Sequence, residues 1–487
     1  MKIVKDILYK VSIKAVHGST SVGFNEIQFN SRKVGENDMF VAQKGVVFDG
    51  HKFIDKAIEL GAKVIVCEDL PKNINSELVY IKVNDSNEAL AIMAANFYDN
   101  PSSKLKLVGV TGTNGKTTVA TLLYNLFQSA GYKTGLLSTV KVLVDKQEYA
   151  ATHTTPNSLA INNYLNEMVE AGVDFCFMEV SSHGIHQKRT EGLQFDGGVF
   201  TNLTHDHLDY HKTFKEYRDV KKMFFDTMSK NAFALVNIDD KNGAVMLQNT
   251  TAKKYTYAQK TMADFKVKIL ESQFTGLLLT INENEVWAKL IGSFNAYNLV
   301  AVYGVSQLLG MESIESLRII SELENVSGRF QHFISEDGVT AIIDYAHTPD
   351  ALKNVLETIN DIRTGNEEII TVVGCGGDRD KTKRPIMGRI ASQLSTQVIF
   401  TSDNPRSEDA QSILDEIELG VEPQNYRKTL TILDREQAIK TATKLAKKGD
   451  IILIAGKGHE TYQEVNGVRT HFNDFEKVSQ YLNAIEN

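Results

Sequence analysis

The run VGVTGTNGKTTVATLLYNLFQSAGYKTGLLST, residues 108–139, limits most strongly what this chain can fold into. It begins with a short apolar segment, turns through a glycine-rich stretch, continues with apolar residues at helical spacing and ends in a second apolar segment. This order predicts a strand, a tight turn, a helix and a second strand. In such an α/β unit the N-terminus of the helix faces the carboxyl edge of the sheet.

The glycine-rich turn departs at one position from the strict phosphate-loop pattern, which has a glycine five positions before Gly115 where this chain has a valine. The physical requirements of the loop are still met. Gly109, Gly112 and Gly115 let backbone N–H groups approach an anion, while Lys116 and Thr117 add a cation and a metal-binding hydroxyl. The turn therefore predicts nucleotide binding, with an ordinary strand-to-helix turn as the alternative.

Length and composition predict a multidomain protein that acts on small molecules. A chain of 487 residues exceeds the usual domain size of about 100–200 residues. Its formal charge of −8, without a long basic run, argues against nucleic acid as a partner. Three widely separated cysteines offer no disulfide framework, and no stretch resembles a signal peptide or the roughly 20 apolar residues of a membrane span. We therefore expect a cytoplasmic protein without membrane insertion.

The order of apolar runs and turns predicts three α/β domains. A small domain covers residues 1–103 and ends at the turn-rich YDNPSSK. A central phosphate-loop ATPase domain with a parallel sheet covers residues 104–330, with β-hairpins expected between Lys253 and Lys289. The strand-and-helix alternation then restarts, which predicts a Rossmann-like α/β domain over residues 331–487.

Two polar segments follow predicted strands of the central domain. FCFMEVSSHG places Glu179 at a strand end, where a carboxylate could bind magnesium or remain a solvated loop charge. Residues 201–211, TNLTHDHLDYH, nearly spell the HxHxDH motif of dinuclear zinc hydrolases, but Tyr210 stands where the third histidine is required. Beside a phosphate loop, a single histidine that contacts magnesium is the simpler interpretation.

Seven segments in order resemble the Mur ligases of bacterial cell-wall synthesis: TGTNGKTT, MEVSSHG, THDHLDYH, GSFNAYNLVAV, GRF, DYAHTPDAL and AGKGHE. They run in order through the central and C-terminal predicted domains. The resemblance implies an ATP-driven amide ligase that works through an acyl phosphate. The most similar type of member adds the third amino acid to UDP-MurNAc-L-Ala-D-Glu, and we expect a monomer.

The resemblance also implies which residues contact ATP and magnesium. Lys116 matches the lysine at the γ-phosphate, Thr117 and Glu179 match the ligands of one Mg²⁺, and His207 matches a ligand of a second. The residues that match ATP contacts are Gly112, Thr113, Asn114, Gly115, Lys116, Thr117, Thr118, Asn295, Asn298, Arg329 and Asp344. Helix capping is the alternative for the two asparagines.

The resemblance also implies a lysine that is carbamylated by CO2. In EYRDVKKMFFD the alignment indicates Lys221 rather than Lys222, and the carbamate would add a carboxylate-like group near the second magnesium. The alternative is that both lysines face solvent on a helix.

The resemblance assigns substrate contacts in all three predicted domains. Ser31 and residues 46–48 match contacts of the uridine and diphosphate, and the muramoyl dipeptide is assigned to Thr154, Thr155, Ser181, Gln187 and Arg189. Each small polar residue could instead be a cap or a turn residue.

The segment TSDNPRSED predicts which amino acid is added. Members that add meso-diaminopimelate carry DNPR, which here is Asp403, Asn404, Pro405 and Arg406, whereas lysine-adding members generally lack the arginine. Diaminopimelate has a distal carboxylate that an arginine fork can bind and lysine lacks. The matching pocket residues are Arg379, Gly456 and Glu460. A lysine-adding homologue, a folylpolyglutamate-type ligase and a mechanical ATPase remain the alternatives.

Overall fold

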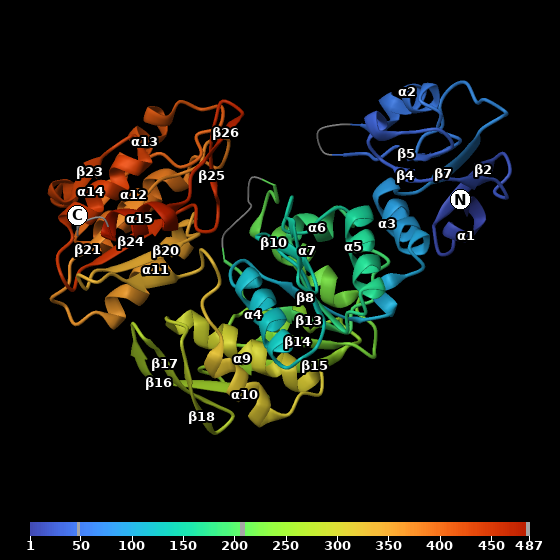
Figure 1. Ribbon diagram of the computed structural model, residues 1–487. Coiled ribbons are helices and arrows are strands. Elements are labelled where there is room, and N and C mark those ends of the chain that lie inside the picture. The colour runs from blue at the N-terminus through green and yellow to red at the C-terminus, as the bar shows by residue number, and fades with distance from the viewer. Residues whose placement is uncertain (46–48, 205–209, 484–487) are drawn as a thin grey trace.

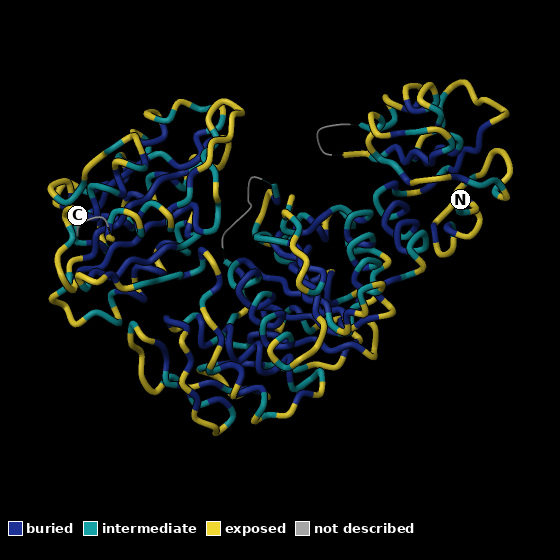
Figure 2. Tube along the Cα trace, viewed as in Figure 1, coloured by how far each residue is buried: buried dark blue, intermediate teal, exposed yellow. Residues whose placement is uncertain are grey.

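A computed structural model describes residues 1–45, 49–204 and 210–483 and shows three α/β lobes in an open arrangement (Figure 1). Each lobe is built on its own sheet, and the strands of each sheet form the buried core while loops and outer helix faces are exposed (Figure 2). The α/β fold class predicted from the sequence is confirmed. No helix in the described part of the chain is both long and apolar enough to cross a membrane.

The N-terminal lobe contains a 5-stranded sheet in the order β2, β7, β6, β5, β4. Its strands are β2 (Ile13–His17), β7 (Val79–Val83), β6 (Val64–Cys67), β5 (Met39–Val41) and β4 (Ile27–Gln28), and β1 (Lys2–Ile3) pairs with β3 (Gly23–Phe24) beside it. The helices are α1 (Val4–Ile7), α2 (Ile54–Glu59) and α3 (Ser86–Phe97). Asp85 caps α3 by accepting hydrogen bonds from two backbone N–H groups.

The central lobe is organised around an 11-stranded sheet. Its order is β11 (Gln147–Ala150), β10 (Lys141–Val144), β9 (Thr134–Leu137), β12 (Phe175–Glu179), β8 (Lys106–Thr111), β13 (Gly197–Phe200), β14 (Phe233–Asn237), β15 (Lys253–Ala258), β16 (Phe265–Gln273), β17 (Gly276–Ile281) and β18 (Asn284–Ala288). Strands β9 to β16 are parallel, as expected, and antiparallel hairpins extend the sheet at both edges.

Helices cover both faces of this sheet. They are α4 (Lys116–Ser129), α5 (Ser158–Glu170), α6 (Ser182–His186), α7 (Phe214–Asp226), α8 (Gly243–Met246), α9 (Ser293–Leu308) and α10 (Ser313–Glu322). One sequence expectation is wrong here: Gly109 lies inside β8, where the Phe224 ring of α7 packs close to its backbone, rather than at the anion-binding turn. Because Gly109 has no side chain, helix α7 can pack closely against β8. The position does not serve as part of a phosphate site.

The C-terminal lobe has a 6-stranded sheet, parallel except for its first strand. The order is β19 (Gln331–Ile334), β20 (Thr340–Asp344), β24 (Ile451–Ala455), β21 (Ile369–Val373), β22 (Gln397–Phe400) and β23 (Thr429–Thr431), and β25 (Tyr462–Val465) and β26 (Val468–His471) form a separate hairpin. The helices are α11 (Pro349–Ile362), α12 (Lys383–Leu394), α13 (Ala410–Glu418), α14 (Arg435–Leu445) and α15 (Asp474–Asn483).

Candidate active site between the central and C-terminal lobes

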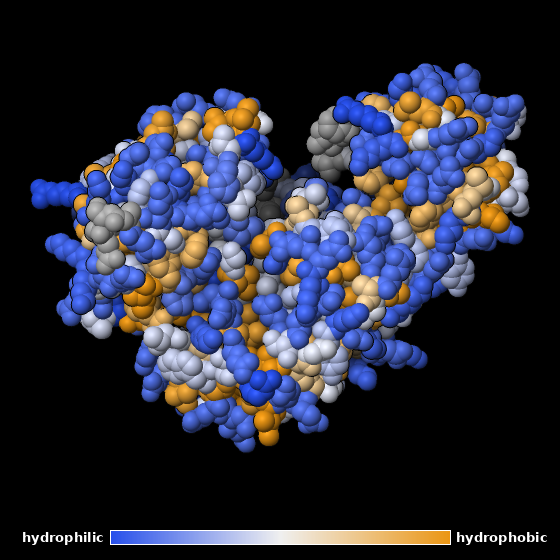
Figure 3. All heavy atoms as spheres, viewed as in Figure 1, coloured by the Kyte–Doolittle hydropathy of each residue, from blue (hydrophilic) through white to orange (hydrophobic). Residues whose placement is uncertain are grey.

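A cavity of about 970 Å³ lies between the phosphate-loop turn of the central lobe and the strand ends of the C-terminal lobe. The space-filling view is hollowed between the lobes, and blue hydrophilic residues border much of the hollow (Figure 3). Eighteen of the residues singled out from the sequence line the cavity: Thr113, Asn114, Gly115, Lys116, Thr117, Thr118, Thr154, Glu179, Asn295, Asn298, Arg329, Asp344, Arg379, Asp403, Asn404, Arg406, Gly456 and Glu460. The fold therefore brings most of the predicted site together.

The glycine-rich turn forms a tight anion-binding geometry at the start of α4. Gly115 precedes the helix with a φ of +88°, and a Cβ there would lie 2.8 Å from Oδ1 of Asn298. Glycine is therefore required for both conformation and space. Lys116 folds back over the turn, where its Nζ donates to the carbonyl oxygens of Gly112 and Thr113 at 3.0 and 2.8 Å. Lys116, Thr117 and Thr118, the first residues of α4, line the cavity.

Glu179 ends β12 as expected, but it is fully buried and not a solvated loop charge. β12 pairs in parallel with β8, so its carboxyl end lies beside the turn. Oε1 accepts a hydrogen bond of 2.7 Å from the backbone N–H of Thr139, and Oε2 accepts one of 3.2 Å from the Thr139 hydroxyl. These donors fix the carboxylate at the cavity wall, which Thr117 also lines.

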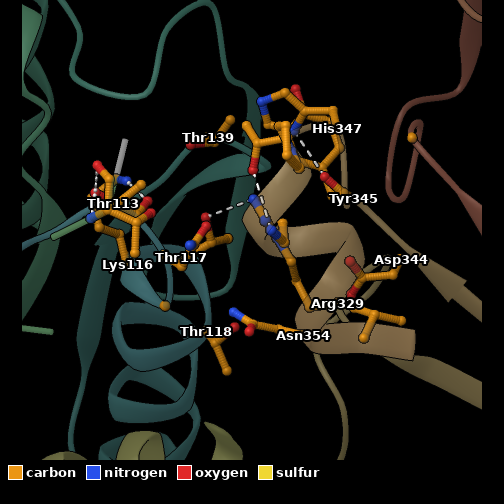
Figure 4. Close-up of a pocket in the computed structure, with 18 of the residues that line it drawn as sticks. Thr113, Lys116, Thr117, Thr118, Thr139, Arg329, Asp344, Tyr345, His347 and Asn354 are labelled. Carbon is orange, nitrogen blue, oxygen red and sulfur yellow. Dashed lines mark hydrogen bonds between the residues drawn. The ribbon is translucent and has the colours of Figure 1, made fainter. Parts of the chain in front are cut away.

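Arg329 joins the two lobes at the cavity. Its Nη2 donates a hydrogen bond of 3.1 Å to the Thr117 hydroxyl, and its guanidinium lies 4.7 Å from the centre of the Tyr345 ring (Figure 4). Asp344 follows on β20, and its Oδ2 accepts from the backbone N–H of Phe330 at 2.7 Å. Burial raises the pKa of Asp344 to about 6, although nearby Arg329 opposes the shift.

Two buried nitrogen atoms at this junction have no hydrogen-bond partner among the described residues: Nε of Arg329 and Nδ1 of His459. The His459 ring lies 5.0 Å from the Tyr345 ring. Burial, with Arg329 as a second cause, lowers the pKa of His459 to about 3, so this imidazole is neutral near pH 7. Buried polar atoms without a protein partner are typical of sites that bind a polar ligand, and Arg329 lines the cavity.

Asn295 and Asn298 lie inside α9, whose N-cap is Gly292, so the capping alternative is wrong. Nδ2 of Asn295 donates to the carbonyl oxygen of Ile291 at 2.7 Å, and Nδ2 of Asn298 donates to Oδ1 of Asn295 at 2.9 Å. This chain of amides orients both side chains at the cavity wall.

Lys221 and Lys222 have different surroundings on α7. Lys221 is buried, and its Nζ donates a hydrogen bond of 2.8 Å to the carbonyl oxygen of Gly112. Nζ of Lys222 instead contacts the carboxylate of Asp226 at 2.6 Å, one helical turn further along. The alternative of two solvent-facing lysines is wrong, and Lys221 is the lysine that contacts the phosphate loop.

The C-terminal wall of the cavity holds a buried polar network around Asn404. Nζ of Lys457 donates to Oδ1 of Asn404 at 2.9 Å, and Nδ2 of Asn404 donates to Oε2 of Glu460 at 2.7 Å. Lys457 is fully buried. Burial, aided by Asp403, raises the pKa of Glu460. The network presents acidic and amide groups to the cavity.

Arg406 is held in an uncommon backbone conformation at the cavity edge. Its φ is +53°, and its backbone N–H donates to the carbonyl oxygen of Glu464 at 3.1 Å, beside the β25–β26 hairpin. Its Nη1 donates to the carbonyl oxygen of Gly377 at 2.7 Å. Arg379, on the loop that contains Gly377, also lines the cavity. Two guanidinium groups therefore border the same end of the cavity.

Three family models match the chain in order. They are described as the Mur ligase family catalytic domain at residues 24–98, the Mur ligase middle domain at residues 110–306, and the Mur ligase glutamate ligase domain at residues 328–458. Together they cover more than half of the sequence.

The chain belongs to the Mur ligase family.

Relatives of this Mur ligase align over nearly its whole length. A UDP-N-acetylmuramoyl-L-alanyl-D-glutamate--2,6-diaminopimelate ligase from Cytophaga hutchinsonii is 54% identical over 483 residues, 99% of each chain. One of the same name from Clostridium tetani is 41% identical over 492 residues, again 99% of each. A solved structure with that enzyme name has a TM-score of 0.70 and 31% identity, covering 100% of this chain and 99% of the other. MurF from Thermotoga maritima, solved with ADP, shares the fold at 22% identity, a TM-score of 0.63 and coverage of 94% and 96%.

Other residues expected at the substrate lie beside the cavity rather than on its wall. Thr155 is buried, and its hydroxyl donates to the hydroxyl oxygen of Ser181 at 3.0 Å; Ser181 also caps α6. Arg189 donates from Nη1 to the carbonyl oxygen of Thr155 at 2.6 Å and from Nη2 to Oε1 of Gln187 at 2.6 Å. These four side chains form one connected group in this Mur ligase.

Some expected residues are placed elsewhere or lie outside the description. Pro405, Gly112 and Lys221 adjoin the cavity without lining it, whereas Ser31 lies in the N-terminal lobe, at the start of a short 3-10 helix. His207 and residues 46–48 fall outside the described residues.

Sequence reasoning missed several residues that hold this site together. Thr139 binds Glu179, Lys457 orients Asn404, and Tyr217 on α7 contacts the Thr113 hydroxyl at 3.1 Å. Lys457 lies within AGKGHE, so that segment carried the one available signal. The other two are single polar residues without a motif of their own.

Proposed function

We propose that this Mur ligase adds meso-diaminopimelate to UDP-MurNAc-L-Ala-D-Glu with ATP, in the synthesis of peptidoglycan precursors. The observation that carries the proposal is the pairing of a phosphate loop with the Arg406 loop across one cavity. The full-length relatives named as this ligase support it, at up to 54% identity.

The residues present fit ATP and magnesium. Gly115 keeps the turn free of a side chain, Lys116 supplies a cation, and Nε of Arg329 is a buried donor without a partner among the described residues. The Thr117 hydroxyl and the Glu179 carboxylate are hard oxygen ligands of the kind that Mg²⁺ prefers. We propose that these two would hold one Mg²⁺, with His207 at a second. Bound magnesium would neutralise phosphate charge during phosphoryl transfer.

The proposed reaction has two steps. An oxygen of the D-Glu γ-carboxylate attacks the γ-phosphorus of ATP, the bond to the bridging oxygen breaks, and ADP leaves with an acyl phosphate formed. The amine of diaminopimelate then attacks the acyl carbon, phosphate leaves with the electron pair of its C–O bond, and the nitrogen loses a proton. Lys116 and Arg329 would stabilise the negative charge of the transferred group. Approach of the C-terminal lobe would exclude water from the acyl phosphate.

We propose that Arg406 and Arg379 bind the distal carboxylate of diaminopimelate, while Asn404 and Glu460 receive its distal ammonium, with Asp403, Pro405 and Gly456 shaping the pocket. An ammonium would pair with the Glu460 carboxylate, whose ionised form is disfavoured by burial. Lysine lacks the second carboxylate and would leave both guanidinium groups without a carboxylate partner. The connected group of Thr155, Ser181, Gln187 and Arg189, together with Thr154, would bind the muramoyl dipeptide, and Ser31 the uridine end.

We further propose that Lys221 is carbamylated. In that modification the neutral ε-amine attacks the carbon of CO2, and the nitrogen loses a proton to leave an anionic carbamate. The contrast between the two lysines supports Lys221, because Lys222 is engaged by Asp226 whereas Lys221 contacts the phosphate loop.

The proposal includes three domains with the boundaries given above, residues 1–103, 104–330 and 331–487, a cytoplasmic location and a monomeric state. Gel filtration with light scattering would test the last of these.

Phosphate release from ATP tests the proposal when it is compared across amino acids. The assay contains magnesium and UDP-MurNAc-L-Ala-D-Glu, with meso-diaminopimelate, L-lysine or no amino acid. We expect release and a tripeptide product with diaminopimelate alone. A preference for lysine would support the proposed ligase reaction but contradict the proposed specificity for diaminopimelate. Release of phosphate without any amino acid would favour a mechanical ATPase.

A further inference from the structure

Behind the two cavity arginines lies an ion pair, with one fully buried partner, that the proposed reaction does not use. Arg384, at the start of α12, is fully buried, and its guanidinium binds Glu408 in a two-pronged contact: Nη1 to Oε2 at 3.0 Å and Nη2 to Oε1 at 2.8 Å. A second carboxylate, Glu416 on α13, accepts from Nη1 at 2.9 Å. Neither Arg384 nor Glu408 lines the cavity.

Glu408 connects the two loops that carry the cavity arginines. Its Oε1 accepts a hydrogen bond of 2.6 Å from the backbone N–H of Asp378, the residue before Arg379. Its Oε2 also contacts Nζ of Lys381 at 2.9 Å. Glu408 itself lies two residues after Arg406, on the loop that follows β22. One carboxylate therefore binds the loop after β21 from its place on the loop after β22.

Further contacts between the two loops reinforce this connection. The Ser407 hydroxyl donates to Oδ1 of Asp378 at 2.6 Å, and the backbone N–H of Gly377 donates to the carbonyl oxygen of Asn404 at 2.9 Å. A Cβ on Gly377 would lie 1.9 Å from the carbonyl oxygen of Pro405, so the backbones approach as closely as glycine permits. Both Asp378 and Arg406 have positive φ, at +54° and +53°. Such strained conformations persist only where surrounding contacts hold them.

Charge explains why Glu408 suits this position. The hydrogen bonds from Arg384 and Lys381 lower the pKa of Glu408 to about 2, so it remains an anion throughout the neutral range. An anion accepts with both oxygens, and each oxygen of Glu408 receives two donors. A neutral amide of the same shape would turn one NH2 group towards these donors. The connection between the loops therefore depends on the charge of one side chain.

We propose that Glu408, supported by Arg384, is a positioning residue that sets the spacing of Arg379 and Arg406 and thereby the specificity for an amino acid with a distal carboxylate. The inference rests on the proposed function. Neither residue touches substrate in this proposal. They hold together the two loops that carry the guanidinium groups, and a site of this kind loses affinity when its supporting contacts loosen.

The structure supplies a matched pair of variants. Glu408→Gln removes the charge of the carboxylate that joins the two loops, and Glu416→Gln makes the same change on a carboxylate that binds Arg384 but neither loop. Both variants alter the surroundings of the same buried guanidinium. A purely structural role would make them similar, whereas a positioning role would separate them.

We expect Glu408→Gln to raise the KM for meso-diaminopimelate by about tenfold or more, with the KM for ATP changed less than about twofold. The ratio of kcat/KM for meso-diaminopimelate to that for L-lysine should fall in parallel. Glu416→Gln should leave both KM values within about twofold of wild type. Equal effects of the two variants, or an equal rise in the KM for ATP, would overturn the inference.

A second variant keeps the inference testable if Glu408→Gln does not fold. Ser407 is exposed, so Ser407→Ala removes one contact between the loops with little risk to the core, and it should raise the KM for meso-diaminopimelate by about two- to fivefold. An unchanged KM in both Ser407→Ala and Glu408→Gln would overturn the inference while wild-type turnover upheld the proposed function. Failure of the wild-type protein to use meso-diaminopimelate would overturn the proposed function and the inference with it.

Discussion

Nζ of Lys221 donates a hydrogen bond of 2.8 Å to the carbonyl oxygen of Gly112, and so joins helix α7 to the phosphate loop. Lys222, the next residue, points to Asp226 instead. The two neighbours offer a direct test of the proposed carbamate. We expect Lys221→Ala and Lys221→Arg to lose about 100-fold or more in phosphate release, because neither side chain can form a carbamate. Lys222→Ala should retain most activity.

Bicarbonate dependence separates a carbamate from a simple cationic role of Lys221. Activity of the wild-type protein should fall after exhaustive removal of dissolved CO2 and return on addition of bicarbonate. A carbonyl resonance should appear in ¹³C NMR with labelled bicarbonate, and Lys221→Ala should lack it. Wild-type-like activity of Lys221→Ala without bicarbonate would contradict the proposal.

Alanine variants of two glycines with nearly the same φ can distinguish backbone strain from a role of the phosphate loop in ATP binding. Gly115 has a φ of +88° and Gly131, just after α4, a φ of +90°. A Cβ on Gly131 meets no atom within 4 Å, whereas one on Gly115 meets Asn298 at 2.8 Å. Both alanine variants should lose about 1–2 kcal/mol of stability from the strained φ, as measured by denaturant unfolding. Gly115→Ala should in addition lose ATP binding in calorimetry, and equal ATP affinity in the two variants would refute this account of the loop.

The raised pKa of Asp344 predicts that the use of ATP depends on pH. Burial raises its pKa from the usual 3.8 to about 6, so the free enzyme protonates Asp344 as the pH falls through 6. Because the proposed ATP contact needs the carboxylate as an acceptor, kcat/KM for ATP should decrease below about pH 6. Asp344→Asn should lower kcat/KM and abolish this acidic limb. If the acidic limb of the pH profile is unchanged in Asp344→Asn, the decrease in kcat/KM below about pH 6 is caused by another group.

The raised pKa of Asp344 also predicts how the stability of the folded state changes with pH. A raised carboxyl pKa means that the folded state holds a proton that the unfolded state has released, so stability decreases as the pH rises from about 4 to above 6. Asp344→Asn has no such group. The Tm of Asp344→Asn relative to wild type should therefore be higher at pH 8 than at pH 4, and the reverse order would show that Asp344 is stabilised as an anion.

Arg406 is best replaced by asparagine. Its φ of +53° would strain alanine, whereas asparagine tolerates positive φ. We expect Arg406→Asn to raise the KM for meso-diaminopimelate by about 100-fold, the loss of a charged fork to a carboxylate, with little effect on L-lysine turnover. Arg427→Asn, at an exposed arginine of the same lobe, is the control. Parallel losses on both amino acids would show that Arg406 does not contact the distal carboxylate.

Lys457 should act through Asn404, since its Nζ donates to Oδ1 and so fixes which way the amide points. Lys457→Met should reduce kcat/KM for meso-diaminopimelate by about tenfold, with the KM for ATP nearly constant. A double-mutant cycle tests the route: in an Asn404→Ala background there is no amide to orient, so Lys457→Met should add little. Additive effects would show that Lys457 acts independently.

Much of the site could be predicted because local patterns reflect local physics. Glu179 was expected at a strand end and lies there, because parallel strands place their carboxyl ends at one edge of the sheet. The Gly115 turn likewise follows from neighbouring residues. Gly109 shows the limit, since its role depends on Phe224, a helix residue distant in sequence that packs against β8.

Local patterns in the sequence predict the α/β class, the phosphate-loop turn, the strand-end carboxylate and the arginine-bearing loop, because each arises from residues within a few positions of one another. The tertiary structure alone decided that Arg329 reaches Thr117, that Lys457 orients Asn404 and that Glu408 binds the loop of Arg379. These contacts join residues 212, 53 and 30 positions apart. Their geometry depends on how the lobes and sheets pack, which no local pattern of charge or hydropathy encodes.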